Sequence, residues 1–241
     1  MANPKEETLL EHLEALRMVL LKSLIALALL LIPMFFLAPY FIDFLIQVMT
    51  ARHPIALNYF APMEVFILQI KAALILDLLI CFPYIARQAW GFILPALYEN
   101  ERKFIKSIVL SSSMLFIIGI LFCLFFILPL VMRFGMSFQS AHLQAVFGIS
   151  NIISLALWLS LIFGIMFQFP LITYALIRSN IASYKTIKSK RSYVFIGILI
   201  LSALLTPPDV VSQLMLALPT YALFEAGLFM GKKNKHTSKK L

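Results

Sequence analysis

Six long apolar runs are the feature of this chain that most limits how it can fold. They cover residues 19–38, 65–86, 107–131, 152–177, 193–205 and 210–230. A helix needs roughly 20 apolar residues to cross a hydrocarbon layer of ~30 Å. Charged residues make up only 13% of the chain, against about a quarter in soluble domains. Because the runs also lack the alternating pattern of barrel strands, the sequence predicts an all-α integral membrane protein with six transmembrane helices.

The fifth run differs from the others in its length. Residues 193–205 would cover only about 20 Å as a helix, and the turn sequence TPPD follows at residues 206–209. We expect the fifth and sixth helices to form a short hairpin that thins the bilayer or leans on its neighbours. Prolines at positions 33, 83, 129, 170 and 219 lie within or near the ends of the runs, and each favours a kink in its helix.

The distribution of Lys and Arg predicts the orientation of the chain. Sixteen of them fall in the N-terminal segment, the second and fourth connections and the C-terminal tail, whereas the opposing loops hold Arg52 and Arg133. By the positive-inside rule both termini lie in the cytoplasm. The net charge of +9 is then a topology signal, and we expect the basic tail, residues 231–241, to touch solvent or lipid headgroups rather than nucleic acid.

Residues 1–241 read as a single polytopic membrane domain without a long linker or a repeat of fixed period. No cleavable signal peptide is expected, because acidic residues precede a first run that is long enough to span the membrane. We therefore expect the first run to remain as the first transmembrane helix.

Two acidic clusters are predicted on the cytoplasmic side. Residues 1–18 read as an amphipathic helix with leucines on one face and Glu7, Glu11 and Glu14 on another. The second cluster holds Glu99 and Glu101 and follows the second run. Either cluster could be an ordinary solvated face or pair with nearby basic residues, but an exposed pair contributes less than ~1 kcal/mol. Basic residues are the usual neighbours of the anionic cytoplasmic leaflet, so the location of the two acidic clusters weakens their reading as an ordinary solvated face.

Three motifs resemble those of the TatC family, the signal-peptide receptor of twin-arginine protein export. HLEALR at residues 12–17 resembles the opening motif of that family. PYIARQAWGFILPALYENER at residues 83–102 is similar to its first cytoplasmic loop, and LTPPDVVSQ at residues 205–213 is similar to its last periplasmic turn. The motifs occur in the family's order across six runs, so the resemblance covers nearly the whole chain.

The resemblance implies a core subunit of the bacterial inner-membrane translocase that binds the twin-arginine signal peptides of folded precursor proteins. It also implies a cupped bundle of kinked helices. The signal-peptide site that it implies consists of Glu14, Arg17, Phe92 and Glu101. A guanidinium group offers a planar fork of donors that matches a carboxylate, which lysine cannot do. Two acids from distant parts of the chain would therefore bind two adjacent arginines of a signal peptide.

The resemblance further implies partners within the membrane. TatA- and TatB-like single-span proteins would dock at the last two helices and their turn, in a region that includes Leu204, Thr206, Asp209 and Gln213. Gln168 in the fourth run belongs to the same intramembrane polar set, although relatives commonly carry Glu there. Glutamine keeps its hydrogen-bonding groups but has no titratable proton. Self-association in the receptor complex is also implied, with energy from the proton-motive force or from the partners.

Other classes of function receive less support from the residues. Cys81 and Cys123 lie inside runs at no metal-ligand spacing, so we expect both to be buried as apolar packing residues. The four histidines are scattered, and we expect no metal or cofactor. No HExxH, GxSxG or P-loop motif occurs, and we expect no enzyme. A small-molecule secondary transporter would also carry polar intramembrane residues, but usually in two related halves. Asp77, in the second run, has no assigned role.

Overall fold

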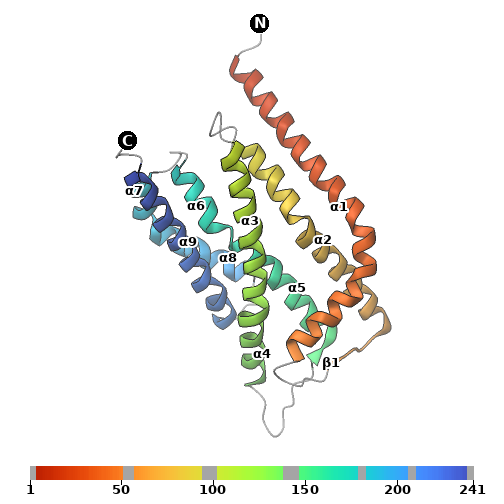
Figure 1. Cartoon of the computed structure of the whole chain (residues 1–241). Coiled ribbons are helices and arrows are strands. Elements are labelled where there is room, and N and C mark those ends of the chain that lie inside the picture. The colour runs from red at the N-terminus through yellow and green to blue at the C-terminus, as the bar shows by residue number, and fades with distance from the viewer. Residues whose placement is uncertain are drawn as a thin grey trace. The chain divides into compact units, whose positions relative to one another are not determined.

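The computed structural model describes residues 4–50, 57–93, 102–137, 147–178, 183–205 and 210–237 of the chain. Within them, helices dominate and two short strands pair (Figure 1). The elements are α1 (Pro4–Thr50), β1 (Leu57–Asn58), α2 (Pro62–Ile93), α3 (Arg102–Phe122), the π-helical turn η1 (Cys123–Ile127), α4 (Leu128–Met136), β2 (Phe147–Gly148), α5 (Ile149–Met166), α6 (Phe169–Arg178), α7 (Tyr184–Ser189), α8 (Arg191–Leu205) and α9 (Val210–Thr237). They belong to two compact units, Met1–Ile46 with Tyr59–Ser113 and Gln47–Asn58 with Met114–Leu241.

The predicted transmembrane helices are confirmed by the helices of the structure. Among the described residues, five stretches are long and apolar enough to cross a membrane: Leu13–Thr50, Pro62–Phe92, Lys106–Met136, Ile149–Arg178 and Gln213–Lys232. They correspond to the first four runs and the sixth. The fifth run forms α8, whose 15 residues confirm the predicted short helix. The first helix is longer than predicted, since α1 does not end at residue 38 but continues to Thr50.

A side chain of α2 allows α1 to continue past its second proline. Pro39 has no N–H, so the carbonyl of Phe35, four residues earlier, loses its usual helical partner. The Nε2 atom of Gln69 donates a hydrogen bond to that oxygen at 3.2 Å, and the ring of Phe66 packs edge to face on Phe35. This replacement bond is one way in which membrane helices accommodate proline. Figure 1 shows α1 changing direction in the half that contains its prolines.

Two further prolines interrupt helices of the second unit in different ways. Ahead of Pro129, the turn η1 widens the helix, and the N–H of Leu128 bonds to the carbonyl of Cys123. Such π-helical turns are a common form of local distortion in a long helix. Ahead of Pro170 the helix stops instead, because α5 ends and α6 begins only at Phe169. The fourth predicted run is therefore one span with a break at residues 167–168.

The second unit has an apolar core around η1 and α5. Its buried members are Cys123, Ile127, Leu159, Ile162, Phe163, Met166, Phe167 and Leu216. Cys123 is fully buried in this cluster, as predicted for an apolar packing residue. α3 approaches α5 closely at Gly119, because glycine has no Cβ atom. A Cβ atom at this position would lie 2.6 Å from the carbonyl oxygen of Phe163.

Glycines on α9 bring its backbone against α6. A Cβ atom at Gly227 would lie 2.7 Å from both Cα and the carbonyl oxygen of Pro170, and one at Gly231 would lie 2.5 Å from Cδ1 of Ile177. The two glycines are four residues apart, the spacing that lets membrane helices approach at backbone distance. Because contact advances along both helices in the same direction, α6 and α9 run parallel, as alternating spans require.

The two short strands join segments that are far apart in the sequence. β1 pairs with β2 in parallel, with Leu57 opposite Phe147 and Asn58 opposite Gly148. β1 follows the first span and β2 follows the third. Their pairing places both connections on one side of the membrane, which agrees with the alternation of the spans.

Candidate functional site

The signal-peptide residues predicted near the N-terminus lie on the exposed part of α1. Glu14 and Arg17 are both exposed, and no side chain from residue 13 to residue 33 is buried. Burial in α1 begins at Met34 and continues at Ala38, Ile42 and further residues at helical spacing. Within residues 13–33, Glu14 and Arg17 therefore lie on a stretch of α1 whose side chains are exposed or half-buried.

Phe92 and Glu101 are the other two residues of the predicted signal-peptide site, and the described residues include only Phe92. Phe92 lies at the C-terminal end of α2 and is half-buried. Glu101 lies outside the described residues, directly before α3 begins at Arg102. The convergence of Glu14 and Glu101 on one peptide therefore remains a prediction.

The predicted docking residues of the last two helices have different surroundings. Leu204 is 78% exposed, whereas Gln213 is half-buried and its Nε2 atom donates to the carbonyl of Leu199 at 3.1 Å. Gln213 thus ties α9 to α8. Thr206 and Asp209 lie outside the described residues.

Gln168 lies in the break between α5 and α6 and is buried, with 8% exposure. Its Nε2 atom donates to the carbonyl of Gly164 at 3.4 Å. The backbone carbonyl of Gln168 accepts hydrogen bonds from the backbone N–H groups of Leu171 and Ile172 at 3.0 and 2.9 Å. Gln168 therefore connects the end of α5 to the first turn of α6, and its side chain faces the interior of the protein.

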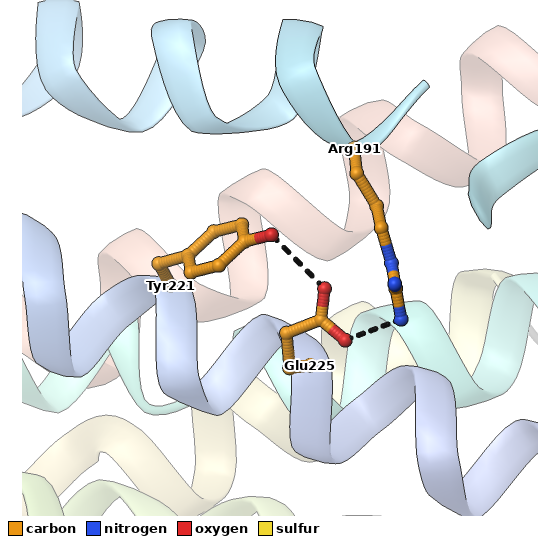
Figure 2. Close-up of polar contacts among 3 residues, drawn as sticks. All are labelled: Arg191, Tyr221 and Glu225. Atoms are coloured by element: carbon orange, nitrogen blue, oxygen red, sulfur yellow. Dashed lines mark hydrogen bonds and ion pairs between the residues drawn. The ribbon is translucent and has the colours of Figure 1, made fainter. Parts of the chain in front are cut away.

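A polar network that the sequence analysis did not identify joins α8 to α9. Nη2 of Arg191 lies 2.6 Å from Oε2 of Glu225, and the Tyr221 hydroxyl donates to the other carboxylate oxygen at 3.1 Å. Figure 2 shows the carboxylate of Glu225 held between its two partners. Both side chains of the ion pair are about one-third exposed, at 37% and 31%. Within the described part of the chain, the buried Nε atom of Arg191 has no hydrogen-bond partner.

The network follows the antiparallel packing of the α8–α9 hairpin. Gln213 bonds to Leu199, the ring of Tyr221 packs edge to face on Phe195, and Glu225 pairs with Arg191. Positions that ascend along α9 therefore meet positions that descend along α8. An acid inside an apolar run is costly and marks a functional or structural site, so Glu225 could have been singled out in the sequence, but its partner 34 residues away could not.

Asp77 forms a buried polar contact within α2. Its side chain is 3% exposed, and its carboxylate oxygen Oδ1 lies 3.8 Å from Sγ of Cys81, one turn later. The thiol is a weak donor. The prediction that Cys81 is buried is confirmed, and its contact with Asp77 adds a polar role to its packing.

Comparisons with known proteins decide the family. A family model described as Sec-independent protein translocase protein (TatC) matches residues 11–219. The chain belongs to the TatC family. TatC of Carboxydothermus hydrogenoformans is 36% identical over 229 residues, which are 95% of this chain and 94% of that protein. TatC of Haemophilus influenzae is 34% identical over 238 residues, which are 96% of this chain and 92% of that protein.

Solved structures of TatC share the fold. A crystal structure of the twin arginine translocase receptor TatC matches with a TM-score of 0.83 at 31% identity, over 92% of this chain and 98% of that one. A crystal structure of the same receptor in DDM matches with a TM-score of 0.84 at 31% identity, over 91% of this chain and 99% of that one. These matches confirm the predicted all-α membrane fold with six transmembrane helices.

TatC membership confirms the predicted function class. The chain is a multi-pass membrane component of the twin-arginine, Sec-independent protein translocation system of bacteria. TatC proteins are components of a protein translocase and not an enzyme family. The comparisons give no support to the alternative of a small-molecule secondary transporter.

Proposed function

We propose that this chain is the signal-recognising subunit of the translocase and that Glu14 and Glu101 receive the paired arginines of an export signal. The observation that carries the proposal is the exposure of Glu14 within the HLEALR motif, on a stretch of α1 without buried side chains. A carboxylate there is free to bind a guanidinium group from another protein. Bidentate arginine–carboxylate pairs are stronger and more directional than lysine pairs, which explains a preference for arginine.

Arg17 and Phe92 complete the proposed site. Arg17 follows Glu14 by three residues and is exposed like it, so it lies on the same side of the helix. Its charge reduces the repulsion between the carboxylates while the site is empty. Phe92, at the end of α2, offers an apolar surface for the residues that flank the arginines.

Peptide co-purification tests this proposal. The purified chain should retain a signal peptide bearing Arg-Arg and release one bearing Lys-Lys at the same positions. Glu14→Gln and Glu101→Gln should each weaken Arg-Arg binding by about 10- to 150-fold, since a hydrogen bond to a charged group contributes about 1.5 to 3 kcal/mol. Glu64→Gln is the matched control, because the Glu64 carboxylate accepts the backbone N–H of Phe60 at the start of α2. Equal retention of the two peptides would refute the assignment.

The orientation with both termini in the cytoplasm is part of the same proposal. Its support is the concentration of Lys and Arg in alternate connections and in both terminal segments. Fusions of a compartment-sensitive reporter after residue 241 and within residues 138–146 should report opposite sides. The same side for both fusions would contradict the proposal.

TatA- and TatB-like single-span proteins are the proposed partners of α8 and α9, and a second copy of this chain is the proposed partner in the receptor complex. Support comes from the exposure of Leu204 and from membership in a translocase. Thr206, Asp209 and Gln213 would belong to this docking surface, and Gln168 would contribute a polar group within the membrane.

Disulfide crosslinking in membranes tests the partner surface. A Leu204→Cys variant should crosslink to a cysteine placed in the transmembrane helix of the partner. Ile198→Cys should not, because Ile198 is only 3% exposed on the same helix. Crosslinking of both variants to the same extent would remove the assignment of this face.

A further inference from the structure

The connection between α6 and α8 contains an ordered basic helix. α7 begins after Ser183, whose hydroxyl accepts the backbone N–H of Thr186 at 3.1 Å and caps the helix. Tyr184 and Ile187 pack against the buried cluster of α6, α8 and α9 formed by Ile177, Ile198, Ala217, Phe224 and Leu228. The lysines at positions 185, 188 and 190 point away from this cluster and are exposed. α7 is therefore packed against α6, α8 and α9 on one side and exposes its lysines on the other.

The local charge of this region is strongly positive. Residues 178–205 contain five Lys or Arg residues and no Asp or Glu. The acid that approaches from α9 is Glu225, which is already engaged by Arg191 and Tyr221 (Figure 2). The exposed lysines therefore keep an excess of positive charge that complements an anion.

The α8–α9 hairpin is too short to carry the Arg191–Glu225 ion pair out of a hydrocarbon core of normal thickness. From Arg191 to Leu205, α8 has 15 residues and covers about 22 Å. The stretch of α9 from Val210 to Glu225 covers about 24 Å. Both are shorter than a hydrocarbon core of ~30 Å. Because the ion pair is one-third exposed, contact with acyl chains would be costly, and the bilayer is expected to thin until headgroups reach it.

An apolar stripe continues directly from the lysines. Tyr193, Ile196 and Ile200 are all more than half exposed, and their spacing puts them on one face of α8. Tyr193 lies three residues after Lys190, at the level where tyrosine commonly meets lipid headgroups. A basic edge followed by an apolar helix face matches the two parts of a phospholipid.

We propose that the α7–α8 junction binds an anionic phospholipid, with its phosphodiester headgroup at Lys185, Lys188 and Lys190 and its acyl chains along Tyr193, Ile196 and Ile200. The charge complementarity of the lysines and the shortness of the hairpin favour a lipid over an acidic protein segment. Each lysine near an anionic membrane surface contributes on the order of 1 kcal/mol. The proposal does not depend on the signal-peptide site or on the orientation of the chain.

Native mass spectrometry of the full chain tests the proposal. The protein is released from micelles that contain equal amounts of phosphatidylglycerol and phosphatidylcholine with the same acyl chains. We expect retained phosphatidylglycerol in excess of phosphatidylcholine, and a loss of affinity of about 100-fold when Lys185, Lys188 and Lys190 are all changed to Gln. The triple change of these residues to Arg should keep the preference, which separates the loss of charge from a failure to fold.

A tail variant provides the matched control. Lys235→Gln, Lys239→Gln and Lys240→Gln remove the same charge from the C-terminal tail and should leave the preference for phosphatidylglycerol unchanged. Equal losses in both Gln variants would mean that binding follows net charge, and would overturn the site. Equal retention of the two lipids by the unaltered chain, or loss of the preference in the Arg variant, would overturn it as well.

Discussion

The close approach of α6 and α9 predicts a graded response to alanine at three glycines. A Cβ atom at Gly227 would lie 2.7 Å from two backbone atoms of Pro170, whereas ordinary contact begins at 3.4 Å. The helices would have to separate by about 0.7 Å, and a gap of 0.5–1 Å already forfeits a quarter to a half of the dispersion energy of the contact. Overpacking of this kind typically costs about 1–3 kcal/mol.

The matched control is Gly197→Ala in α8, because a Cβ atom there meets nothing within 4 Å. Alanine is a better helix former than glycine by about 1 kcal/mol, so Gly197→Ala should be neutral or stabilising. The difference between the Gly197→Ala and Gly227→Ala variants isolates the steric cost. Gly231→Ala should fall between them, since its nearest contact is the flexible end of the Ile177 side chain.

The assay is the unfolding of the purified chain in mixed micelles with a denaturing detergent, followed by tryptophan fluorescence. The free energy of unfolding should decrease in the order Gly197→Ala, Gly231→Ala, Gly227→Ala. The expected gap between the first and the last is about 1–3 kcal/mol. Equal stability of the three variants would show that α6 and α9 do not pack at backbone distance.

Two further predictions concern polar contacts between helices. Gln69→Leu should lower the free energy of unfolding by about 0.6–1.7 kcal/mol, the range measured for such bonds in membranes, and the loss should disappear in a Pro39→Ala background, where the helix recovers its own N–H donor. Equal losses in both backgrounds would contradict the role of Gln69. A double-mutant cycle of Arg191→Gln and Glu225→Gln in the same assay should give a coupling energy of about 1 kcal/mol. This value lies between that of a fully exposed ion pair and that of a buried hydrogen bond to a charged group, because the pair is one-third exposed. A coupling energy of zero would refute a contribution of the pair to the stability of the hairpin.

The sequence predicted the spans well because their information is local. The length of an apolar run determines whether a helix can cross the bilayer, so the short fifth helix could be read from residues 193–205 and the turn after them. The Lys and Arg count likewise needs only the sequence. These features do not depend on which helices meet.

Features that depend on contacts between helices could not be predicted in the same way. A proline signals a lost hydrogen bond but not its replacement, so α1 continues past Pro39 with a donor from Gln69, whereas the chain breaks ahead of Pro170. The glycine pair on α9 and the acid Glu225 were visible in the sequence. Their partners on α6 and α8 were not, because nothing local identifies them.

The same distinction between local features and contacts of distant segments applies to the candidate site. Exposure of Glu14 agrees with a motif-based prediction, since a charged residue at the end of a span stays in contact with water. Its meeting with Glu101 is a contact between distant segments and remains a prediction. The docking roles of Gln168 and Gln213 stay predictions, and the structure adds that both side chains form hydrogen bonds inside the chain. A polar side chain in a membrane helix can bond to the backbone of its own chain, so polarity alone does not identify a docking surface.

The two faces of α9 explain how a short hairpin can be stable and still leave a surface for other molecules. Gly227 and Gly231 bring one face against α6 at backbone distance. The other face is held against α8 by the ion pair of Glu225 with Arg191 and by the packing of the Tyr221 ring on Phe195. The polar side chains are thereby used inside the hairpin, and the side that remains open is apolar, as Leu204 shows. Whatever binds this part of the chain in the bilayer therefore meets an apolar face of α8, with exposed lysines at the end marked by α7. A lipid and a single-span partner can both use that face, but only the lipid requires the lysines.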